Sequence, residues 1–344
     1  MSPLQLVMSM MRTEIRIALP SKGRLQLSTS EFLAACGLGV KQSVTRSYVG
    51  SIPALPGVTV ILQRPRDIVV SVANGGVDFG ITGFDVVQEA NVNGAVRVIH
   101  DALGFGRCRI VAAVPESWPV KKMADLADFA RTLPHPLRVA SVFPHLTREF
   151  LRSHGVNPIS LIEAEGSLEV VPEIGYADMI VDVVETGATL AQNRLRAIED
   201  GTILKTQSCL IANRESLKRP EVMRVAETVL EYIEAHLRAE DQFMIFANVR
   251  GESFEAVGHT VTTQTTLGGL QGPTISRIYP NPAHVQDHAG EWFSVNIVVG
   301  RSGLTDAIQQ MRGIGGSGVV VTPITYIFEE QPDRVAQLRL DPAP

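Results

Sequence analysis

Short apolar runs that end in a polar or glycine-containing turn recur along the first 190 residues of this chain, and most lead into a helical pattern. The runs that we expect to form strands are residues 14–19, 58–62, 77–83, 110–114, 137–141 and 178–184. The helical patterns are residues 28–36, 68–73, 84–90 and 145–154, with a longer one at 220–239. Strands that alternate with helices predict an α/β fold, in which a parallel sheet is covered on both faces and ligands bind at the carboxyl ends of the strands.

The α/β pattern divides into two units. Residues 104–109 resemble a crossover between them, and we expect the chain to cross back near residues 190–204. We therefore predict one lobe from residues 14–108 together with 193–239, and a second lobe from residues 109–192. Two lobes joined by paired crossovers leave a cleft, which is a common location for a ligand.

The pattern changes after residue 240. A strand at 243–249, a helix at 252–259, strands at 274–279 and 292–300, a helix at 305–312 and a strand at 318–323 give the order βαββαβ. This order predicts a ferredoxin-like domain over residues 240–330. The Thr- and Gly-rich loop at 260–272 is expected to be mobile, and the tail after Glu329 peripheral.

Composition excludes several classes of protein. The 344 residues carry 31 Lys and Arg against 36 Asp and Glu, a formal net charge of -5, so a nucleic-acid surface spread over the whole molecule is not expected. No apolar stretch approaches the roughly 20 residues that span a bilayer. Residues 1–11 lack the features of a signal peptide and are expected to be a disordered extension or an upstream start. The cytoplasm is the expected location.

Three cysteines are far apart in the sequence. Cys36, Cys108 and Cys209 show no paired spacing, which favours a reduced setting over a disulfide framework. Each is expected to be a small buried hydrophobic residue.

The segment from Val181 to Leu190 predicts a phosphate site. After the apolar run, Thr186, Gly187, Ala188 and Thr189 can present backbone N–H groups and two hydroxyls to one anion at a helix N-terminus. Turns of this kind often only reverse the chain, and Glu185 would repel a bound phosphate unless it turns away or meets a metal. Asp182 precedes the turn and is suited to sugar hydroxyls or a hydrated divalent metal.

Basic and acidic residues near the other predicted turns could complete such a site. Three cationic pairs lie near strand ends or the crossover: Lys22 and Arg24, Arg64 and Arg66, Arg107 and Arg109. Three pairs around one cleft would suit a ligand with several phosphates, although some will be surface charges. Glu169 is a second carboxylate for the lobe that carries the turn, or a first-turn residue favoured by a helix dipole.

Two other chemistries are disfavoured. His284 and His288 are four residues apart, but Pro280 and Pro282 precede them and no third ligand is nearby, so a zinc site is not expected. None of the cysteines has the sequence context of a covalent nucleophile.

Seven short motifs, taken together and in this order, resemble the ATP phosphoribosyltransferase family. They are residues 20–25, 64–68, 78–83, 104–107, 141–145, 166–169 and 182–190. Residues 272–275 and 313–318 resemble the regulatory domain of the long form of that family. The resemblance covers roughly residues 14 to 328. It implies two lobes like those of periplasmic binding proteins, plus an ACT-like regulatory domain.

The resemblance also implies an activity. ATP and phosphoribosyl pyrophosphate would give N1-(5-phosphoribosyl)-ATP and pyrophosphate in the first step of histidine biosynthesis, with Mg²⁺ required. Its catalytic residues would be Glu169 and Asp182. The residues that would hold the ribose and 5-phosphate are Asp182, Glu185, Thr186, Gly187, Ala188 and Thr189. Those that would face ATP and pyrophosphate are Lys22, Gly23, Arg24, Arg64 and Arg66. Mg²⁺ would bind mainly through substrate phosphates, with Asp182 as a candidate ligand.

Members of the long form assemble as hexamers and are inhibited by histidine. By position, Leu270, Thr274, Gly316 and Gly318 would line the histidine pocket, and exchange between dimer and hexamer would be expected. Ala247 and Asn248 stand where an acid would pair with the amino group of histidine, which is a departure from the pattern of the long form. A non-catalytic ligand sensor, or a regulatory subunit with the same fold, is the alternative function.

Overall fold

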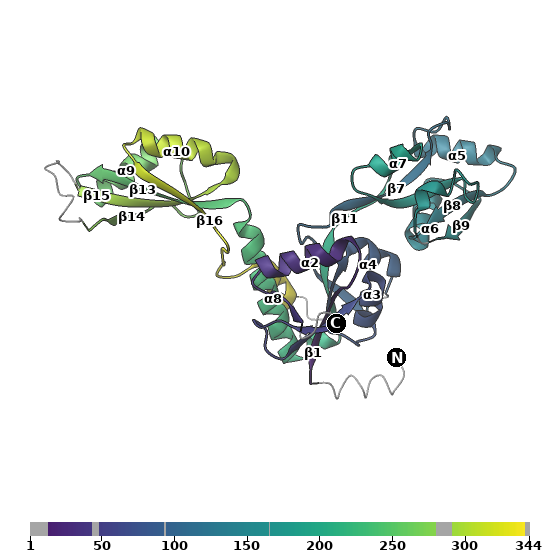
Figure 1. Cartoon of the computed structure of the whole chain (residues 1–344), viewed down its shortest axis with the longest axis horizontal. Helices are drawn as coiled ribbons and strands as arrows, with labels where there is room; N and C mark the ends of the chain where they lie inside the picture. The colour runs from purple at the N-terminus through teal and green to yellow at the C-terminus, as the bar shows by residue number, and fades with distance from the viewer. Residues whose placement is uncertain (1–12, 43–47, 93, 165, 280–290, 341–344) are drawn as a thin grey trace. The chain divides into compact units, whose positions relative to one another are not determined.

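The computed structural model describes residues 13–42, 48–92, 94–164, 166–279 and 291–340. Contacts between Cα atoms divide the chain into one unit of residues 1–233 with 331–344, and a second unit of residues 234–330. The first unit holds a seven-stranded and a five-stranded sheet, which we call the first and second lobes, and the second unit holds a four-stranded sheet (Figure 1). His284, His288 and most of the N-terminal extension lie outside the described residues.

The first lobe has the strand order β2-β3-β4-β1-β5-β12-β6. Its strands are β1 (Ile15–Pro20), β2 (Lys41–Gln42), β3 (Val49–Ser51), β4 (Val58–Gln63), β5 (Phe79–Gly83), β6 (Val96–His100) and β12 (Ser208–Asn213). Its helices include α2 (Arg24–Ala35), α3 (Pro65–Ala73) and α4 (Phe84–Ala90), which pack against the sheet (Figure 1). Apolar side chains of α3, such as Ile68, Val69 and Val72, are fully buried in the core that they share with the strands.

The second lobe has the strand order β11-β7-β10-β8-β9. Its strands are β7 (Cys108–Pro115), β8 (Leu137–Ser141), β9 (Ile159–Glu163), β10 (Met179–Val184) and β11 (Leu195–Thr206). Its helices are α5 (Met123–Thr132), α6 (Pro144–Ser153), α7 (Ala188–Gln192) and the short 3₁₀ turn η1 (Leu168–Val170). Strand β11 extends this sheet beyond residue 192, and two separate clusters of buried apolar residues cover its faces.

Both sheets of the first unit are mixed, so the prediction of parallel sheets was only partly right. Strands β4, β1 and β5 are parallel, as are β10, β8 and β9. Strand β12 is antiparallel to both of its neighbours, and β7 is antiparallel to both β10 and β11. Strands β7 and β12 each follow a crossover, and β11 leads into β12 through a single residue, Gln207. The edge strand β3 is also antiparallel to its neighbours β2 and β4.

The two crossovers are bonded to each other. Ser208 N–H donates to the Phe105 carbonyl at 3.0 Å, and Leu103 N–H donates to the Ser208 carbonyl at 3.1 Å. The side chain of Gln207 accepts from the Gly104 N–H at 3.1 Å. The crossing back therefore occurs at residues 206–208, somewhat later than the sequence analysis placed it.

One local motif occurs in both lobes. Asp78, which directly precedes β5, accepts from the Arg16 N–H at 2.8 Å and donates its own N–H to the Arg16 carbonyl at 2.9 Å. Asp178, which directly precedes β10, makes the same two contacts with Arg138, at 2.7 and 2.9 Å. A guanidinium also pairs with each carboxylate, from Arg219 at 2.7 Å in the first lobe and from Arg138 at 2.6 Å in the second. This aspartate motif fixes the start of the central strand in each lobe.

The C-terminal helix α11 (Asp333–Leu340) belongs to the first unit. Its side chains Val335 and Leu338 are each 2% exposed, and Arg97 of β6 donates to the Leu338 carbonyl at 3.3 Å. The prediction that the tail is peripheral was therefore wrong for this helix, which packs beside an edge strand that would otherwise be open. Helix α8 (Pro220–Ala239) leads from the first unit into the second.

The second unit has the element order predicted for it. Strand β13 (Gln242–Gly251), helix α9 (Phe254–Gln264), strands β14 (Thr274–Arg277) and β15 (Glu291–Gly300), helix α10 (Leu304–Gly313) and strand β16 (Ser317–Pro323) follow one another. The sheet order is β14-β15-β13-β16, with every neighbouring pair antiparallel. Both helices lie on one face of this sheet, over a single apolar core (Figure 1).

Candidate functional site

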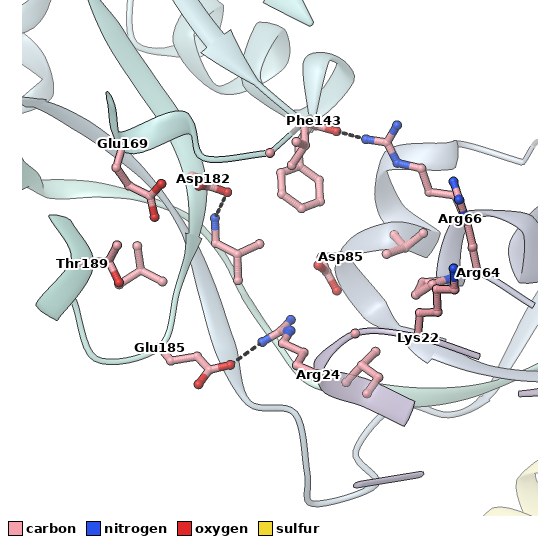
Figure 2. Close-up of a pocket in the computed structure, with 18 of the residues that line it drawn as sticks. Lys22, Arg24, Arg64, Arg66, Asp85, Phe143, Glu169, Asp182, Glu185 and Thr189 are labelled. Carbon is pink, nitrogen blue, oxygen red and sulfur yellow. Dashed lines mark hydrogen bonds and ion pairs between the residues drawn. The ribbon is translucent and has the colours of Figure 1, made fainter. Parts of the chain in front are cut away.

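A pocket of about 850 Å³ lies in the first unit and is lined by residues of both lobes (Figure 2). Its lining residues follow the carboxyl ends of β1, β4 and β5 in the first lobe and of β8 and β10 in the second. Parallel strands in an α/β sheet end at the same edge, so their following loops converge there.

Within the described part of the chain, no helix is long and apolar enough to cross a membrane.

The first lobe supplies a cationic wall. Lys22, Arg24, Arg64 and Arg66 all line the pocket, on the loops after β1 and β4 and in the first turns of α2 and α3. Gly23 has φ of 76°, the left-handed region that favours glycine, and it directly precedes α2. Pro65 stands at the first position of α3, where its missing N–H costs nothing, so this helix begins three residues before the predicted start at residue 68.

Arg24 reaches across to the second lobe. Its guanidinium donates to the Glu185 carboxylate at 3.0 Å and to the Cys108 sulfur at 2.9 Å. Burial alone would lower the pKa of Arg24, but these hydrogen bonds outweigh it and raise the pKa above its usual value. Burial raises the pKa of the Cys108 thiol as well, against the influence of Arg24, so the thiol stays protonated near neutral pH.

Cys108 thus differs from the expectation of a buried hydrophobic residue. Cys36 and Cys209 are fully buried, whereas Cys108 is half-buried and bonded to a pocket arginine. All three cysteines are free.

Arg66 also bridges the lobes. Its guanidinium donates to the Val142 carbonyl, on the loop between β8 and α6, and lies 4.0 Å from the Glu163 carboxylate at the end of β9. A third contact between the lobes involves Glu89 of α4, whose carboxylate accepts from the N–H groups of His145 and Leu146 at 2.8 and 3.0 Å. Glu89 therefore caps α6 from the other lobe.

The second lobe supplies a carboxylate pair. Asp182, on β10, and Glu169, on the η1 turn, both line the pocket. Burial raises the pKa of Asp182 to about 6, a hydrogen bond from the Val183 N–H opposes this rise, and the nearby charge of Glu169 adds to it. Such a carboxylate readily accepts a cation or a hydroxyl donor, because either one relieves the unfavourable charge.

The predicted phosphate turn follows Asp182. Glu185, Thr186, Gly187 and Thr189 line the pocket, whereas Ala188 is absent from its lining. Gly187 has φ of 87° and directly precedes α7, a helix of five residues. The Ala188 N–H lies 3.4 Å from the Thr186 hydroxyl, a long contact that an anion could replace. The exposed Glu185 turns toward Arg24, with which it forms an ion pair at 3.0 Å (Figure 2).

Asp85 is a pocket residue that the sequence analysis missed. It lies in the first turn of α4 and is 4% exposed, yet it lines the pocket. Its partner Thr206 is 121 residues away, so no local pattern could reveal the site. The pocket also includes Asp67 and Phe143, which we had not predicted, whereas Arg107 and Arg109 are not among its lining residues.

Two of the four residues proposed for a histidine pocket lie on different edge strands of the second unit. Thr274 begins β14 and Gly318 lies in β16, whereas Leu270 and Gly316 lie in the loops that precede these strands. These strands form opposite edges of the sheet, with β15 and β13 between them. Three strand spacings separate the edges by about 14 Å.

A magnesium ion fits the donors of the first unit only in part. The described residues hold no group of three or more His, Cys, Asp or Glu side chains placed to bind a metal. Mg²⁺ in phosphate-handling sites is usually held by one or two carboxylates plus substrate phosphates and water. Asp182 and Glu169 provide that smaller set, so the ion would depend on the substrate for its remaining ligands.

Comparison with known proteins shows the family. The model of the family described as HisG, ATP phosphoribosyltransferase, matches residues 64–235, and that of the HisG C-terminal domain matches residues 239–326. The chloroplastic ATP phosphoribosyltransferase 2 of Arabidopsis thaliana is 40% identical over 334 residues, which cover 95% of this chain and 80% of that protein. This chain belongs to the ATP phosphoribosyltransferase family.

Other members of the family are similar over most of their length. The ATP phosphoribosyltransferase of Gemmatimonas aurantiaca is 36% identical, over 91% of this chain and 99% of that protein. Among solved structures, a chain of the HisG:HisZ ATP phosphoribosyl transferase complex from Thermotoga maritima is 26% identical with a TM-score of 0.50. It covers 64% of this chain and 98% of its own.

Proposed function

We propose that this chain transfers the phosphoribosyl group of phosphoribosyl pyrophosphate to N1 of ATP and releases pyrophosphate, the first step of histidine biosynthesis. Family membership supports the reaction class. The observation that carries the assignment is one pocket with a cationic wall from the first lobe, opposed by a carboxylate pair and a small-residue turn from the second. These are the groups that a polyphosphate and a phosphorylated ribose would require.

The phosphate turn would hold the 5-phosphate of the sugar. The backbone at Thr186, Gly187 and Ala188 and the hydroxyls of Thr186 and Thr189 are the donors available there, as predicted from the sequence. Glu185 would release Arg24 when the phosphate binds, because the guanidinium gains a stronger anionic partner. The Glu185 carboxylate, without Arg24 as its partner, would then be solvated by water.

The carboxylate pair would orient the ribose. Asp182 and Glu169 can accept hydrogen bonds from its hydroxyls while positive charge develops at the anomeric carbon. Mg²⁺, when bound, would neutralise charge on the pyrophosphate group. Asp182 and Glu169 are the side chains that would hold the ion. Binding of a cation or hydroxyl donor would favour the ionised form of Asp182.

The cationic wall would hold ATP and the leaving pyrophosphate. Lys22, Arg64 and Arg66 face the pocket without a nucleophile among them, so rate enhancement comes from alignment of N1 with the anomeric carbon and from charge neutralisation. Arg66 must first give up its contact with the Val142 carbonyl, which links substrate binding to a rearrangement between the lobes.

The proposal extends to the domains and to regulation. We assign residues 14–108 with 193–239 and residues 109–192 to two catalytic lobes of periplasmic-binding-protein type, and residues 240–330 to a ferredoxin-like, ACT-like regulatory domain. The strand order β14-β15-β13-β16 supports the latter. Because Thr274 and Gly318 lie on opposite edge strands, a histidine site that uses both would draw on a second copy of the chain, in keeping with a homo-hexamer.

The test is an absorbance assay of product formation with ATP, phosphoribosyl pyrophosphate and Mg²⁺, on wild-type protein, Asp182→Asn and a control, Asp128→Asn. Asp128 is an exposed residue of α5 that pairs with Arg131. We expect turnover by the wild type and the control, and at least about a hundredfold loss in Asp182→Asn. A folded wild-type protein that makes no product would reject the enzyme and favour a ligand sensor.

A further inference from the structure

Asp85 is the buried carboxylate of the first-lobe wall, which also carries four cations and one exposed carboxylate, Asp67. It is 4% exposed, and its carboxylate points into the pocket on the side of Arg24 (Figure 2). Burial raises its pKa, although the charge of Arg24 and hydrogen bonds from the start of α4 oppose the rise. A carboxylate lying beside a phosphate is repelled by it, so the part of the ligand that meets Asp85 should present a hydrogen-bond donor or a cation instead.

The surroundings of Asp85 hold its side chain in one position. The Thr206 hydroxyl accepts from the Asp85 N–H at 2.9 Å and lies 3.3 Å from Oδ1, to which it donates. Gly83 leaves room for the carboxylate, since a Cβ there would stand 2.2 Å from Oδ1. An aspartate in the first turn of a helix often does no more than stabilise the helix dipole. Asp85 is also held by Thr206 at the crossover and faces the pocket.

Apolar side chains also line the pocket that Asp85 faces. Leu25 and Val86 line it from the first lobe, and Phe143 from the second. An acceptor between apolar surfaces suits the edge of a purine better than a ribose, which has hydroxyls on most of its carbons. The ribose of phosphoribosyl pyrophosphate already has Asp182 and Glu169 on the other wall.

We propose that Asp85 accepts a hydrogen bond from the 6-amino group of the adenine of ATP and thereby positions N1 for attack. This inference rests on the function proposed above. As the bond between N1 and the anomeric carbon forms, the bond to pyrophosphate breaks and its electron pair leaves with pyrophosphate. The adenine gains one positive charge, shared between N1 and the 6-amino group, and the Asp85 carboxylate stabilises that charge where it develops.

The experiment compares two substrates in three proteins. kcat/KM is measured with ATP and with purine riboside 5′-triphosphate, which lacks the 6-amino group, in wild type, Asp85→Ala and Glu31→Ala. Glu31 is an exposed residue of α2 outside the pocket lining. We expect Asp85→Ala to lower kcat/KM for ATP about 10- to 100-fold and to change kcat/KM for the analogue less than about threefold. Glu31→Ala should retain the wild-type preference for ATP.

An equal loss with both substrates in Asp85→Ala would overturn the proposal, since it would show a structural role or an effect through Arg24. An unchanged rate with ATP would overturn it too. If Asp85→Ala does not fold, Asp85→Asn keeps the size of the side chain and is measured in the same way, with a smaller but still substrate-selective loss expected. Absence of product from the wild type with ATP would instead reject the proposed function, so the two failures are distinguishable.

Discussion

At high pH, the ionised side chain of Asp182 should lower the free energy of unfolding of the second lobe relative to a neutral side chain at the same position. Its pKa in the folded protein is about 6 against an ordinary value of 3.8, so the folded state binds the proton more tightly than the unfolded state. The resulting stability is fully present below pH 3.8 and is lost as the pH rises through about 6. A shift of about two units corresponds to about 3 kcal/mol, an upper bound because the side chain is half-buried.

The substitution Asp182→Asn removes this loss, so the variant should be the more stable protein at pH 8. We expect the difference in the free energy of unfolding between variant and wild type to widen by about 2 kcal/mol between pH 4.5 and pH 8. The chain has two tryptophans, and Trp118 packs in the core of the second lobe. In a Trp292→Phe background, Trp118 fluorescence during urea unfolding therefore reports on that lobe alone.

Asp178 provides the matched control, four residues earlier in the same lobe. Burial alone would raise its pKa, but hydrogen bonds from Arg138 outweigh burial and hold the pKa below its usual value. Asp178→Asn should therefore destabilise the lobe at pH 8, the opposite sign to Asp182→Asn. The reasoning is refuted if Asp182→Asn is no more stable than wild type at pH 8, or if the difference between them does not change with pH.

Three further substitutions test single contacts. Gly187→Ala places a side chain at φ of 87°, so we expect a loss of about 1–2 kcal/mol in the second lobe by urea unfolding and weaker binding of phosphoribosyl pyrophosphate. Thr189→Val removes one hydroxyl and should weaken that binding by about 1.5–3 kcal/mol, measured by calorimetry; unchanged affinity would reject the contact. Glu89→Ala leaves the N–H groups of His145 and Leu146 uncapped, so we expect a loss of about 1 kcal/mol in the free energy of unfolding and a lower melting temperature. An unchanged melting temperature would show that the cap contributes nothing.

Most of the strands that carry the pocket could be predicted from the sequence. Buried strands such as β8 and β10 appear as apolar runs, and the polar residues that follow them point to the ligand edge of the sheet. Strand β12 was missed because one residue, Gln207, separates it from β11, and neither glycine nor proline marks the junction. Its antiparallel direction was equally invisible, since pairing partners are set by tertiary structure.

The candidate site was predictable only where its residues form local motifs. Arg24 and Arg64 lie on turns after strands, so their position suggested a role, and the pocket includes both. The position of the Asp85 side chain is set by hydrogen bonds with Thr206, which is far away in the sequence, and by the space left at Gly83. Contacts of this kind depend on tertiary structure, which the spacing of apolar residues in the sequence does not predict.

The aspartate motif shared by the two lobes separates mechanical support from chemistry. Asp78 and Asp178 each fasten the amino end of a central strand, whereas pocket residues such as Asp85 and Asp182 occupy or follow the opposite end. Inherited changes near the carboxyl ends can therefore alter ligand preference while the framework keeps its anchors. The two lobes share this plan of anchoring, yet the wall from the first lobe is mainly basic and the wall from the second is acidic.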